Sequence, residues 1–526
     1  MEQQMEQRTQ QEIQREIQQE IQQQSGQQLQ RQTQPITQAG FMTVAEDGRV
    51  VLPPIKMYMD NDTGNARRFL DAYGEQVLYC PSEKRWYVFD DVRWVPDTTN
   101  QVERMARQAL EQSYARELEY YHAAERSGMM QGQVQKAGRR QQAAGNLSGL
   151  RSCVGMAALE NSIDPSQFDA DPYWLNLPNG AMNLRELKIR NHHRPEQYFT
   201  KVTRGAFLYD LFSGRELTAE QDGFPAICPH WFQFVMECCM GDADLYLYLQ
   251  RAAGYSALTG DISEQKVFCL AGAGRNGKSL FINTMAMVLG DYASKIEASV
   301  LCRNRYGERD NDLSKELYRI RGSYLVYSNE FGQNSMLNEA FIKAITDGGK
   351  ISCRPLYGAS IEYTPTYTLW FSTNHLPNLQ AMDAGIRRRI EVIPFRNHVP
   401  EELVDRNLAS YFEAEADAIL VWLFTGYWEY LQQGLNPPAV VQQATAQYFA
   451  EQDVFAQFVE EHYQKHAEGK LYAKELYQAY TVWCAETGQQ AVSQIALGKE
   501  LQRLGWEKKK DRSEIFYILR ENTALM

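Results

Sequence analysis

Residues 267–290 of this chain read VFCLAGAGRNGKSLFINTMAMVLG. A short apolar run, which predicts a buried strand, ends in a glycine-rich turn, and the turn opens into an apolar-periodic run that predicts a helix. Within the turn, Gly272, Gly277, Lys278 and Ser279 satisfy the pattern G-x-x-x-x-G-K-[ST], which is the signature of a phosphate-binding loop. The stretch therefore predicts an α/β fold whose core is a P-loop ATPase.

Each residue type in this turn has a physical role. Backbone N–H groups of such a loop and the N-terminus of the following helix face an anion. Lys278 adds a positive charge for the outer phosphates, and Ser279 supplies a hydroxyl for Mg²⁺. We expect ATP and Mg²⁺ as cofactors; a chance glycine-rich turn is the alternative. The expected nucleotide contacts are Gly272, Ala273, Gly274, Arg275, Asn276, Gly277, Lys278, Ser279 and Leu280.

Length and composition indicate a globular protein of several domains. A chain of 526 residues with 44% hydrophobic residues is too long for one core and predicts three or four domains. Residues 1 to about 40 are dominated by glutamine, which predicts a disordered or weakly self-associating tail. The sequence contains neither an apolar run of membrane-spanning length nor a signal-peptide pattern. We expect a cytoplasmic protein.

The nine cysteines are scattered, which is typical of reduced thiols. Cys228, His230, Cys238 and Cys239 form the one grouping that resembles a zinc site. Its spacing matches no common zinc pattern, and the aromatic residues inside it are typical of one face of a core helix. We favour the core helix over a metal site.

The formal net charge of −12 does not favour indiscriminate binding to nucleic acid. It does not exclude such binding either, because an assembly can carry its basic residues on one inner surface while its outside stays acidic.

Residues 56–225 predict a mixed α/β domain without a recognisable catalytic cluster. The patterns predict helices over 65–73 and 101–126, a small antiparallel sheet over 77–97, and a strand pair over 171–184. Residues 131–144 are polar, and we expect them to be mobile.

Polar side chains follow two further predicted strands. Residues 322–330 predict a buried strand that ends at Glu330, where a carboxylate holds Mg²⁺ or orients the attacking water. Most such ATPases place two acidic residues here, whereas this chain has Asn329 before Glu330. Residues 367–374 predict another strand, which ends at Asn374, a residue suited to sensing the γ-phosphate. The alternative for Glu330 is a surface glutamate after a strand, and the alternative for Asn374 is a structural capping role.

Arg387, Arg388 and Arg389 stand directly before a predicted strand at residues 390–395. A cationic triplet usually forms a solvated face. Because this one follows the other ATPase elements, we favour an arginine that reaches the γ-phosphate of a neighbouring subunit.

The C-terminal part predicts helices over 454–466, 473–487 and 493–504, the last capped by Ser493, and then two short strands within 506–520. Three helices and a strand pair are typical of a winged helix-turn-helix. Residues 493–520 contain seven lysines and arginines against four acidic residues, which favours phosphate contacts. The alternative is a protein-docking domain with a solvated basic wing. The expected DNA contacts here are Lys508, Lys509 and Lys510.

Taken in order, the motifs GAGRNGKS, LVYSNE, LWFSTNHLPN and IRRRIEVIPF resemble the superfamily 3 helicases of the phage and plasmid primase-helicase family. The flanking segments GNARRFLDAYG, WYVFDDVRWVPD, LNLPNGAMNL and LQRAAGYSALTG resemble the same family. The resemblance runs from about residue 60 to the C-terminus.

The resemblance implies an AAA+-like core, a hexameric ring, and translocation on single-stranded DNA in the 3′ to 5′ direction. It implies that Lys278 and Ser279 bind phosphate and metal, that Glu330 is the second-motif acid, and that Asn374 is the sensor. Arg388 or Arg389 is then the arginine finger, and Lys350 and Arg354 lie in the hairpin that lines the channel. Asn329 and Gly349 depart from the pattern: Asn329 replaces a small or acidic residue, and Gly349 stands where an acidic residue is common.

The expected domains are a tail (1–55), a helicase-associated α/β domain (56–225), the ATPase (226–436) and a winged-helix domain (437–526). No primase segment with paired carboxylates is visible, so we expect a separate primase or polymerase as partner. The main hypothesis is an ATP-dependent replicative DNA helicase of a phage, prophage or plasmid. Two alternatives stay open: an origin-binding initiator or loader, and an interaction protein with weak ATPase activity. Asn329 is the feature that keeps the last of these open.

Overall fold

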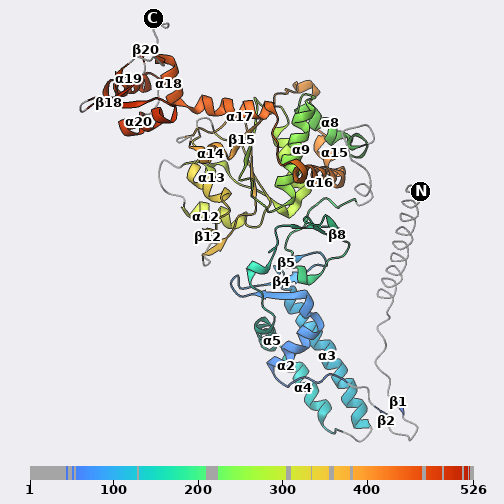
Figure 1. Cartoon of the computed structure of the whole chain (residues 1–526). Coiled ribbons are helices and arrows are strands. Elements are labelled where there is room, and N and C mark those ends of the chain that lie inside the picture. The colour runs from blue at the N-terminus through green and yellow to red at the C-terminus, as the bar shows by residue number, and fades with distance from the viewer. Residues whose placement is uncertain are drawn as a thin grey trace, which may run out of the picture. The chain divides into compact units, whose positions relative to one another are not determined.

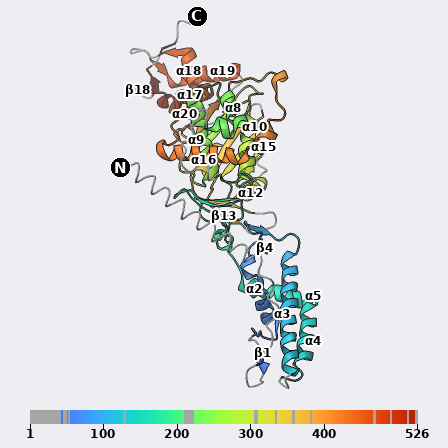
Figure 2. The same cartoon turned by 90° about the vertical axis from the view of Figure 1, so that its right-hand side faces the viewer.

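The computed structural model describes residues 43–44, 50–51, 55–126, 130–208, 223–303, 310–332, 335–354, 360–379, 383–464, 470–487, 491–511, 514–518 and 520–521. The predicted glutamine-rich tail lies outside the described residues. The chain divides into two compact units, one of Met1–Phe89 and Val95–Asp164, the other of Asp90–Trp94 and Pro165–Met526. Figure 1 labels the elements, and Figure 2 gives a second view of them.

The first unit is mainly helical. Its core is formed by buried side chains that include Phe69, Leu110 and Val154. Inside it, Arg68 pairs with Glu117 at 2.5 Å between two neighbouring helices. The elements are β1 (Thr43–Val44), β2 (Val50–Val51), α2 (Asp62–Tyr73), η1 (Gly74–Gln76), β3 (Val77–Cys80), β4 (Arg85–Phe89), β5 (Trp94–Pro96), α3 (Gln101–Arg126), α4 (Gln133–Gly145) and α5 (Leu147–Glu160).

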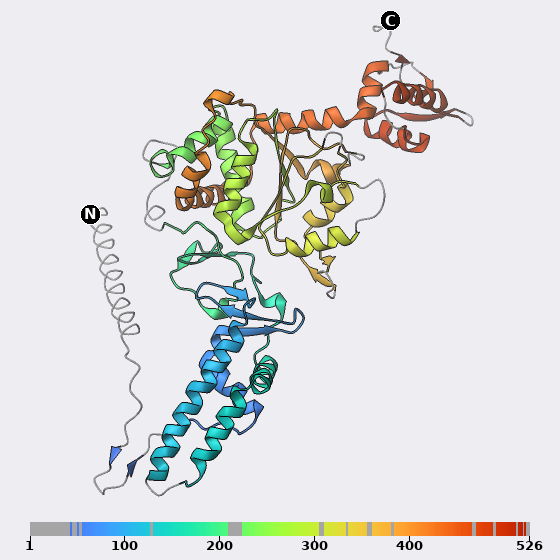
Figure 3. The ribbon, with the colours of Figure 1, turned by 180° about the vertical axis from the view of Figure 1, so that it is seen from behind.

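The polar residues 131–144, which we expect to be mobile, form α4 from Gln133 onward. Figure 3 shows α4 beside α3. Ala137 and Ala144 are buried, and their spacing of seven residues puts both on one face of a helix. The residues around them are Gln, Lys, Arg and Ala, which favour helix even where the sequence is polar.

A parallel five-stranded sheet is the centre of the second unit. Its strands are β9 (Val267–Ala271), β10 (Ala293–Lys295), β11 (Leu325–Asn329), β14 (Thr368–Thr373) and β15 (Ile390–Pro394). Their order across the sheet is β10-β11-β14-β9-β15, and every neighbouring pair is parallel. Every residue of β14 and β15 is buried, as is typical of a parallel sheet covered on both faces. The predicted α/β class is thus confirmed in its coarse form.

Two groups of helices cover this sheet, as Figure 1 shows. Alternate residues of β9 belong to two different cores: Phe268 packs with one group, whereas Val267 packs with the other. The first group is α7 (Phe224–Ile227), α8 (Pro229–Cys238), α9 (Ala243–Leu258), α10 (Lys278–Leu289), α15 (Leu408–Ala414) and α16 (Ala416–Gln433). The second is α11 (Ala298–Leu301), α12 (Asp310–Arg319), α13 (Glu339–Thr346) and α14 (Ala384–Arg387).

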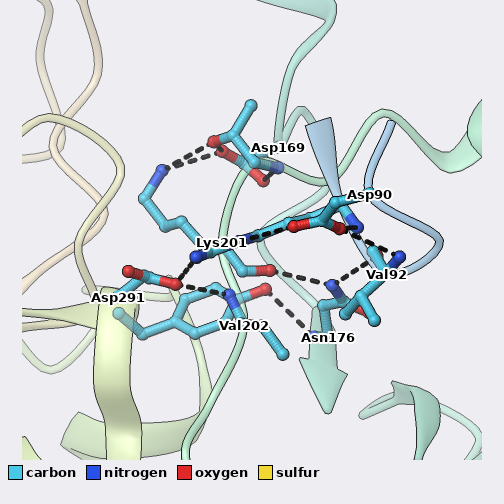
Figure 4. A network of polar contacts seen from close by, with 10 residues as sticks. Asp90, Val92, Asp169, Asn176, Lys201, Val202 and Asp291 are labelled. Atoms are coloured by element: carbon cyan, nitrogen blue, oxygen red, sulfur yellow. Dashed lines mark hydrogen bonds and ion pairs between the residues drawn. The ribbon is translucent and has the colours of Figure 1, made fainter. Parts of the chain in front are cut away.

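Residues 90–94 and 165–208 belong with the sheet rather than with the helical unit, which differs from the expected domain of residues 56–225. Figure 4 shows the polar network responsible. The Nδ2 of buried Asn176 donates to the carbonyls of Val92 at 3.1 Å and Lys201 at 2.9 Å. Asp291, just beyond α10, accepts from the Val202 N–H at 3.1 Å and pairs with Arg93. This region contains β6 (Trp174–Leu177), β7 (Gly180–Asn183) and β8 (Lys188–Arg190).

The sheet domain continues beyond the boundary expected at residue 436. In α17 (Ala439–Gln452), Tyr448 and Phe449 belong to one of the cores of the sheet. The Oγ1 of Thr445 also accepts from the Val392 N–H of β15 at 2.9 Å. The C-terminal region therefore begins near Asp453.

The C-terminal region has its own core, which includes Phe458, Trp483 and Tyr517. The predicted cap of α20 is present, since the Oγ of Ser493 accepts from the Ala496 N–H. The elements are α18 (Val454–His462), β16 (Tyr463–Gln464), β17 (Leu471–Tyr472), α19 (Ala473–Glu486), α20 (Gln494–Arg503), β18 (Lys508–Asp511), β19 (Glu514–Tyr517) and β20 (Arg520–Glu521). β18 and β17 flank β19. Across the described parts of the chain, none of the helices is both long and apolar enough to span a membrane.

Candidate active site

The loop between β9 and α10, residues 272–277, is held tightly by its surroundings; we call it the glycine-rich loop. Gly277 has a φ of 84°, and a Cβ there would lie 2.8 Å from the Sγ of Cys238 and 2.8 Å from the Phe234 ring of α8. A Cβ on Gly272 would lie 2.2 Å from the carbonyl oxygen of Phe395. These positions accept only glycine, since a side chain would displace neighbouring atoms.

Lys278, the first residue of α10, lies inside the loop rather than in solvent. Its side chain is 4% exposed. The Nζ donates to the Gly272 carbonyl at 2.8 Å, to Asn276 Oδ1 at 2.7 Å and to Asn374 Oδ1 at 3.1 Å. Burial lowers the pKa of Lys278, and the charge of Glu330 acts in the opposite direction. The ammonium group is thus fixed in position by three oxygen atoms.

The other predicted residues come from neighbouring strand ends. Glu330 follows β11 and donates its backbone N–H to the Ser372 carbonyl of β14 at 2.8 Å. Its φ is 54°, a left-handed conformation that costs on the order of 1–3 kcal/mol and is most common at functional sites. The Oγ of Ser279 lies 3.1 Å from the Oγ of Ser372. Because β14 pairs with both β9 and β11, Asn374 lies between the loop and Glu330.

A cavity of about 290 Å³ joins these groups. Of the predicted nucleotide contacts, Gly272 and Ala273 do not line it. Its lining residues are Gly274, Arg275, Asn276, Gly277, Lys278, Ser279, Leu280, Glu330, Ser372, Thr373 and Asn374. The structure therefore brings together the predicted loop, the acid and the sensor residue.

A preformed metal site is not part of this arrangement: within the described ranges, no three His, Cys, Asp or Glu side chains are grouped as ligands. Magnesium is usually held by one or two protein oxygens together with substrate phosphates. Ser279 and Glu330 offer that donor set at the edge of the cavity. Ser279 and Glu330 therefore suit a magnesium ion that enters the cavity together with the phosphates of a ligand.

Within the cysteine grouping near His230, Cys238 lies in α8 and Cys228 and Cys239 flank this helix, which packs into a core as predicted. Cys228, Cys238 and Cys239 are buried, and burial raises the pKa of the Cys239 thiol to about 12. His230 Nδ1 lies 2.6 Å from a carboxylate oxygen of Glu415.

The structure separates the three consecutive arginines. Arg389 is 2% exposed, and its guanidinium donates to Thr346 Oγ1 at 2.8 Å and to the Gly385 carbonyl at 2.7 Å. It also pairs with Asp347. The side chain of Arg389 is therefore committed to the fold.

The side chains of Arg387 and Arg388 have surroundings that differ from those of Arg389 and from each other. Arg387 lies 3.4 Å from Asp453 and stacks over the Phe449 ring at 5.2 Å. Arg388 is exposed to solvent. Of the two residues proposed as the finger, only Arg388 has a side chain available to a neighbouring molecule.

The predicted DNA contacts lie on the surface. Lys350 and Arg354 flank β12 (Ile351–Cys353), which pairs antiparallel with β13 (Ile361–Tyr363), and both are exposed. Lys508, Lys509 and Lys510 occupy β18, where every residue is exposed. These two sets do not contribute to the cavity at the glycine-rich loop.

Asn276 and Ser372 are among the polar residues of the site that were not assigned specific roles from the sequence. Asn276 is buried, accepts from Lys278 and donates from Nδ2 to the Phe395 carbonyl at 2.9 Å. Ser372 contacts both Ser279 and Glu330. The available signal for Ser372 was its place directly after the apolar residues 369–371 of β14.

Three family models match the chain. Residues 66–239 match the family described as D5 N terminal like, and residues 450–524 match the family described as poxvirus D5 protein-like. Residues 270–389, which contain most of the candidate site, match a family of unknown function.

Similar proteins occur in large DNA viruses. A "putative helicase" of Acanthamoeba polyphaga mimivirus is 23% identical over 330 residues, which cover 59% of this chain and 32% of that protein. A "putative helicase" of Frog virus 3 is 26% identical over 254 residues, 45% of this chain and 26% of that protein. A "putative primase" of African swine fever virus is 25% identical over 228 residues, which cover 42% of this chain and 22% of that protein. The chain thus spans about a third or less of each relative.

Among solved structures, the NrS-1 C terminal region aligns with a TM-score of 0.46 at 10% identity, over 88% of this chain and all of that one. The matches to both D5-type regions, and viral relatives that are named as helicases and primases, make this chain similar to the phage and viral primase-helicase family.

Proposed function

We propose that this chain is an ATP-dependent replicative DNA helicase of a phage or virus. The observation that carries the proposal is the meeting of Lys278, Ser279, Glu330 and Asn374 around one cavity, at the carboxyl ends of neighbouring parallel strands. Ligands of open α/β sheets bind at this edge. The names of the viral relatives agree with this role.

The residues have distinct parts in the proposed reaction. The N–H groups of the glycine-rich loop and the N-terminus of α10 bind the phosphates of ATP. Ser279 and Glu330 would hold Mg²⁺, which would supply positive charge to the phosphates when bound, and Lys278 offsets charge that develops on the transferred phosphoryl group. Glu330 and Asn374 orient the attacking water. Asn329 is not acidic, so Glu330 alone supplies the carboxylate on β11.

We assign the arginine finger to Arg388, because the Arg389 side chain is held by Thr346, Gly385 and Asp347. The finger acts on the nucleotide of a neighbouring subunit in an AAA+-like ring of the superfamily 3 type. The hexameric state follows from the family resemblance.

DNA contacts are proposed on two surfaces. Lys350 and Arg354 border the hairpin of β12 and β13, which faces single-stranded DNA in the ring's channel during 3′ to 5′ translocation. Lys508, Lys509 and Lys510 form the wing of a winged helix, an interpretation supported by helices α18, α19 and α20 beside the β17-β19-β18 sheet. A separate primase or polymerase is the proposed partner, and the host cytoplasm the proposed site of action.

Strand displacement on a forked DNA with a 3′ tail, with ATP and Mg²⁺, tests this function. We expect the wild-type chain to separate the strands and Lys278→Ala to be inactive. The matched control is Lys136→Ala, which removes an exposed lysine of α4 and should unwind normally. DNA-stimulated hydrolysis without displacement would instead identify an initiator or loader. If the chain shows neither hydrolysis nor strand displacement, the remaining alternative is an interaction protein.

A further inference from the structure

A basic stretch at the edge of the β6-β7-β8 sheet belongs to none of the sites described above. Residues 185–197 read RELKIRNHHRPEQ and contain four lysines and arginines against two glutamates, in a chain whose net charge is −12. The stretch includes the edge strand β8, which is labelled in Figure 1. A local excess of positive charge on an acidic chain indicates a surface for an anionic partner.

The alternation of side chains along β8 separates a core face from a charged face. Ile189 is half-buried and packs against the core, whereas Lys188 and Arg190 on either side of it are exposed. Asn183 of β7 is in register with Lys188 and with Trp174 of β6, so Trp174 shares the charged face. The Arg190 guanidinium lies over the Trp174 ring, 4.6 Å from its centroid. A guanidinium stacked in this way keeps the N–H groups along its edge for an acceptor.

The residues after β8 form a fixed turn. The Nε1 of the buried Trp94 donates to the Pro195 carbonyl at 2.8 Å, and the Arg194 N–H donates to Gln197 Oε1 at 3.0 Å. The Nε of Arg194 donates to His192 Nε2 at 2.9 Å. This bond orients the Arg194 side chain and does not use its two terminal nitrogen atoms.

Both arginines line one cavity of about 530 Å³, which we call the arginine pocket. Its lining residues are Arg190, Arg194, Pro195, Glu196 and Gln197. Within the part of the chain that the structure describes, neither arginine of the pocket is paired with a carboxylate. By contrast, Arg185 lies 3.7 Å from Asp171, and Lys188 lies 3.7 Å from Glu186. Two guanidinium groups without a counter-charge indicate an anion from outside the chain.

The chemistry of the pocket suits a phosphate of a nucleic-acid strand. Guanidinium groups bind phosphate oxygens through paired, charge-assisted hydrogen bonds. Glu196 is exposed, so solvent screens its charge and the two arginines dominate. Arg190 covers the face of Trp174 on this side of the sheet, so that face is not offered to a base. A contact with phosphate alone does not depend on base sequence.

We propose that the arginine pocket binds a backbone phosphate of single-stranded DNA, with Arg190 and Arg194 as its ligands. A single strand bends locally, so its backbone can enter a recessed pocket, and proteins that bind such strands without sequence preference follow the backbone with positive charge. The inference rests on the proposed function, since it takes DNA as the substrate. It adds a third contact to those proposed at the β12-β13 hairpin and at β18.

Fluorescence anisotropy of a labelled oligothymidine, titrated with the full chain at several salt concentrations without nucleotide, tests the proposal. Replacing both Arg190 and Arg194 by glutamine should weaken binding about tenfold at low salt, because charge-assisted hydrogen bonds to the phosphate are lost. The slope of log K against log salt should fall by about 0.7, the value for one phosphate contact on a single strand. Unchanged affinity and slope would overturn the proposal.

Arg185→Gln is the matched control. Arg185 belongs to the same stretch and stacks over the Tyr173 ring at 4.1 Å, but it is paired with Asp171 and does not line the pocket. This variant should bind the oligonucleotide as the wild type does. An equal loss in Arg185→Gln would mean that the whole stretch acts as a diffuse basic surface, which contradicts a pocket for one phosphate.

Lysine at both pocket positions separates a phosphate contact from a role in folding. Arg190→Lys with Arg194→Lys keeps both charges, so the salt slope should be retained although the paired hydrogen bonds are lost. If this variant loses the slope as the glutamine variant does, the arginines only support the fold of the stretch, and the proposal is wrong. A duplex of the same length is the second probe. A loss confined to the duplex would contradict the assignment to single-stranded DNA.

The same titrations distinguish failure of this inference from failure of the proposed function. If the wild type binds no single-stranded DNA, both fail together. If the wild type binds and the double glutamine variant binds equally well, only the arginine pocket is wrong. If the double glutamine variant loses affinity as expected while the wild type does not displace strands, the pocket stands and the helicase function fails.

Discussion

The glycine-rich loop and strand β18 both present lysines, and the structure holds those lysines in opposite ways. Lys278 is buried and contacts three oxygen atoms within 3.1 Å. The three lysines of β18 are exposed, and Lys509 lies 3.4 Å from Glu507. A buried, fixed charge acts at one point on its ligand, whereas exposed charges are screened and act in sum. We therefore expect all-or-none effects at the loop and graded effects at β18.

Lys278→Ala should have the largest effect of any single change. It removes the one ammonium group at the centre of the cavity and leaves Asn276 and Asn374 without their donor. Hydrolysis of ATP should fall by at least about 10³-fold, because loss of one preorganised donor alone costs 10²–10³-fold and phosphate binding is lost as well. Release of phosphate from ATP measures this. Retained turnover would mean that the loop does not bind the reacting phosphates.

Arg388→Ala should stop turnover while nucleotide binding stays largely intact. An arginine finger contributes roughly 10³-fold or more to the rate of phosphoryl transfer. When Arg388→Ala protein is mixed with Lys278→Ala protein, some subunit interfaces have the intact loop of the first variant and the intact arginine of the second. Partial recovery of hydrolysis in that mixture would support action between subunits, and its absence would argue that Arg388 acts elsewhere.

Arg389→Ala is the matched contrast, because its effect should be on folding. Removing this guanidinium leaves the buried Thr346 Oγ1 and the half-buried Gly385 carbonyl without this donor. We expect the free energy of unfolding to fall by about 2 kcal/mol, whereas Arg388→Ala should change it by less than about 0.5 kcal/mol. Denaturant unfolding of both variants measures this. Equal stabilities would remove the distinction between the two arginines.

The division of labour among these arginines was not available from the sequence. All three residues share one chemistry, and consecutive positions at the end of a helix point in different directions, about 100° apart. The direction of each side chain depends on Asp347 and Asp453, which come from distant parts of the chain. The sequence did predict the local elements around the site correctly, since β9, α10, β11 and β14 lie where apolar runs and motifs indicated.

What the sequence lacked was information on long-range packing. The position of β14 between β9 and β11 brings Asn374 to Lys278, and no local pattern encodes a strand order. The N-terminal boundary was displaced for the same reason. Asn176 and Asp291 tie residues 90–94 and 165–208 to the sheet through hydrogen bonds that span large sequence separations.

Glu330→Gln tests whether one carboxylate on β11 is sufficient. The amide keeps the size of the side chain and removes the charge that holds Mg²⁺ and orients water, so ATP binding should persist while hydrolysis falls by roughly 10²-fold. Asn329→Gln is the neighbouring control and should retain hydrolysis. If Glu330→Gln hydrolyses ATP normally, the catalytic acid lies elsewhere. The lack of an acidic residue at Asn329 would then have no bearing on hydrolysis.

The smallest effects should come from β18, where each lysine contributes only part of a screened surface. The logarithm of the binding constant for single-stranded DNA falls by about 0.7 per contacted phosphate for each tenfold rise in salt concentration. Replacing Lys508, Lys509 and Lys510 by alanine should therefore reduce the slope of log K against log salt by about 2. Each single replacement should give about a third of that change, in contrast to the complete loss at Lys278. Fluorescence anisotropy of a labelled oligonucleotide at several salt concentrations measures the slope, with Lys136→Ala as the control. An unchanged slope in the triple variant would make β18 a solvated surface of a protein-docking domain, and the comparison with the loop would then concern two functions rather than two ways of binding phosphate.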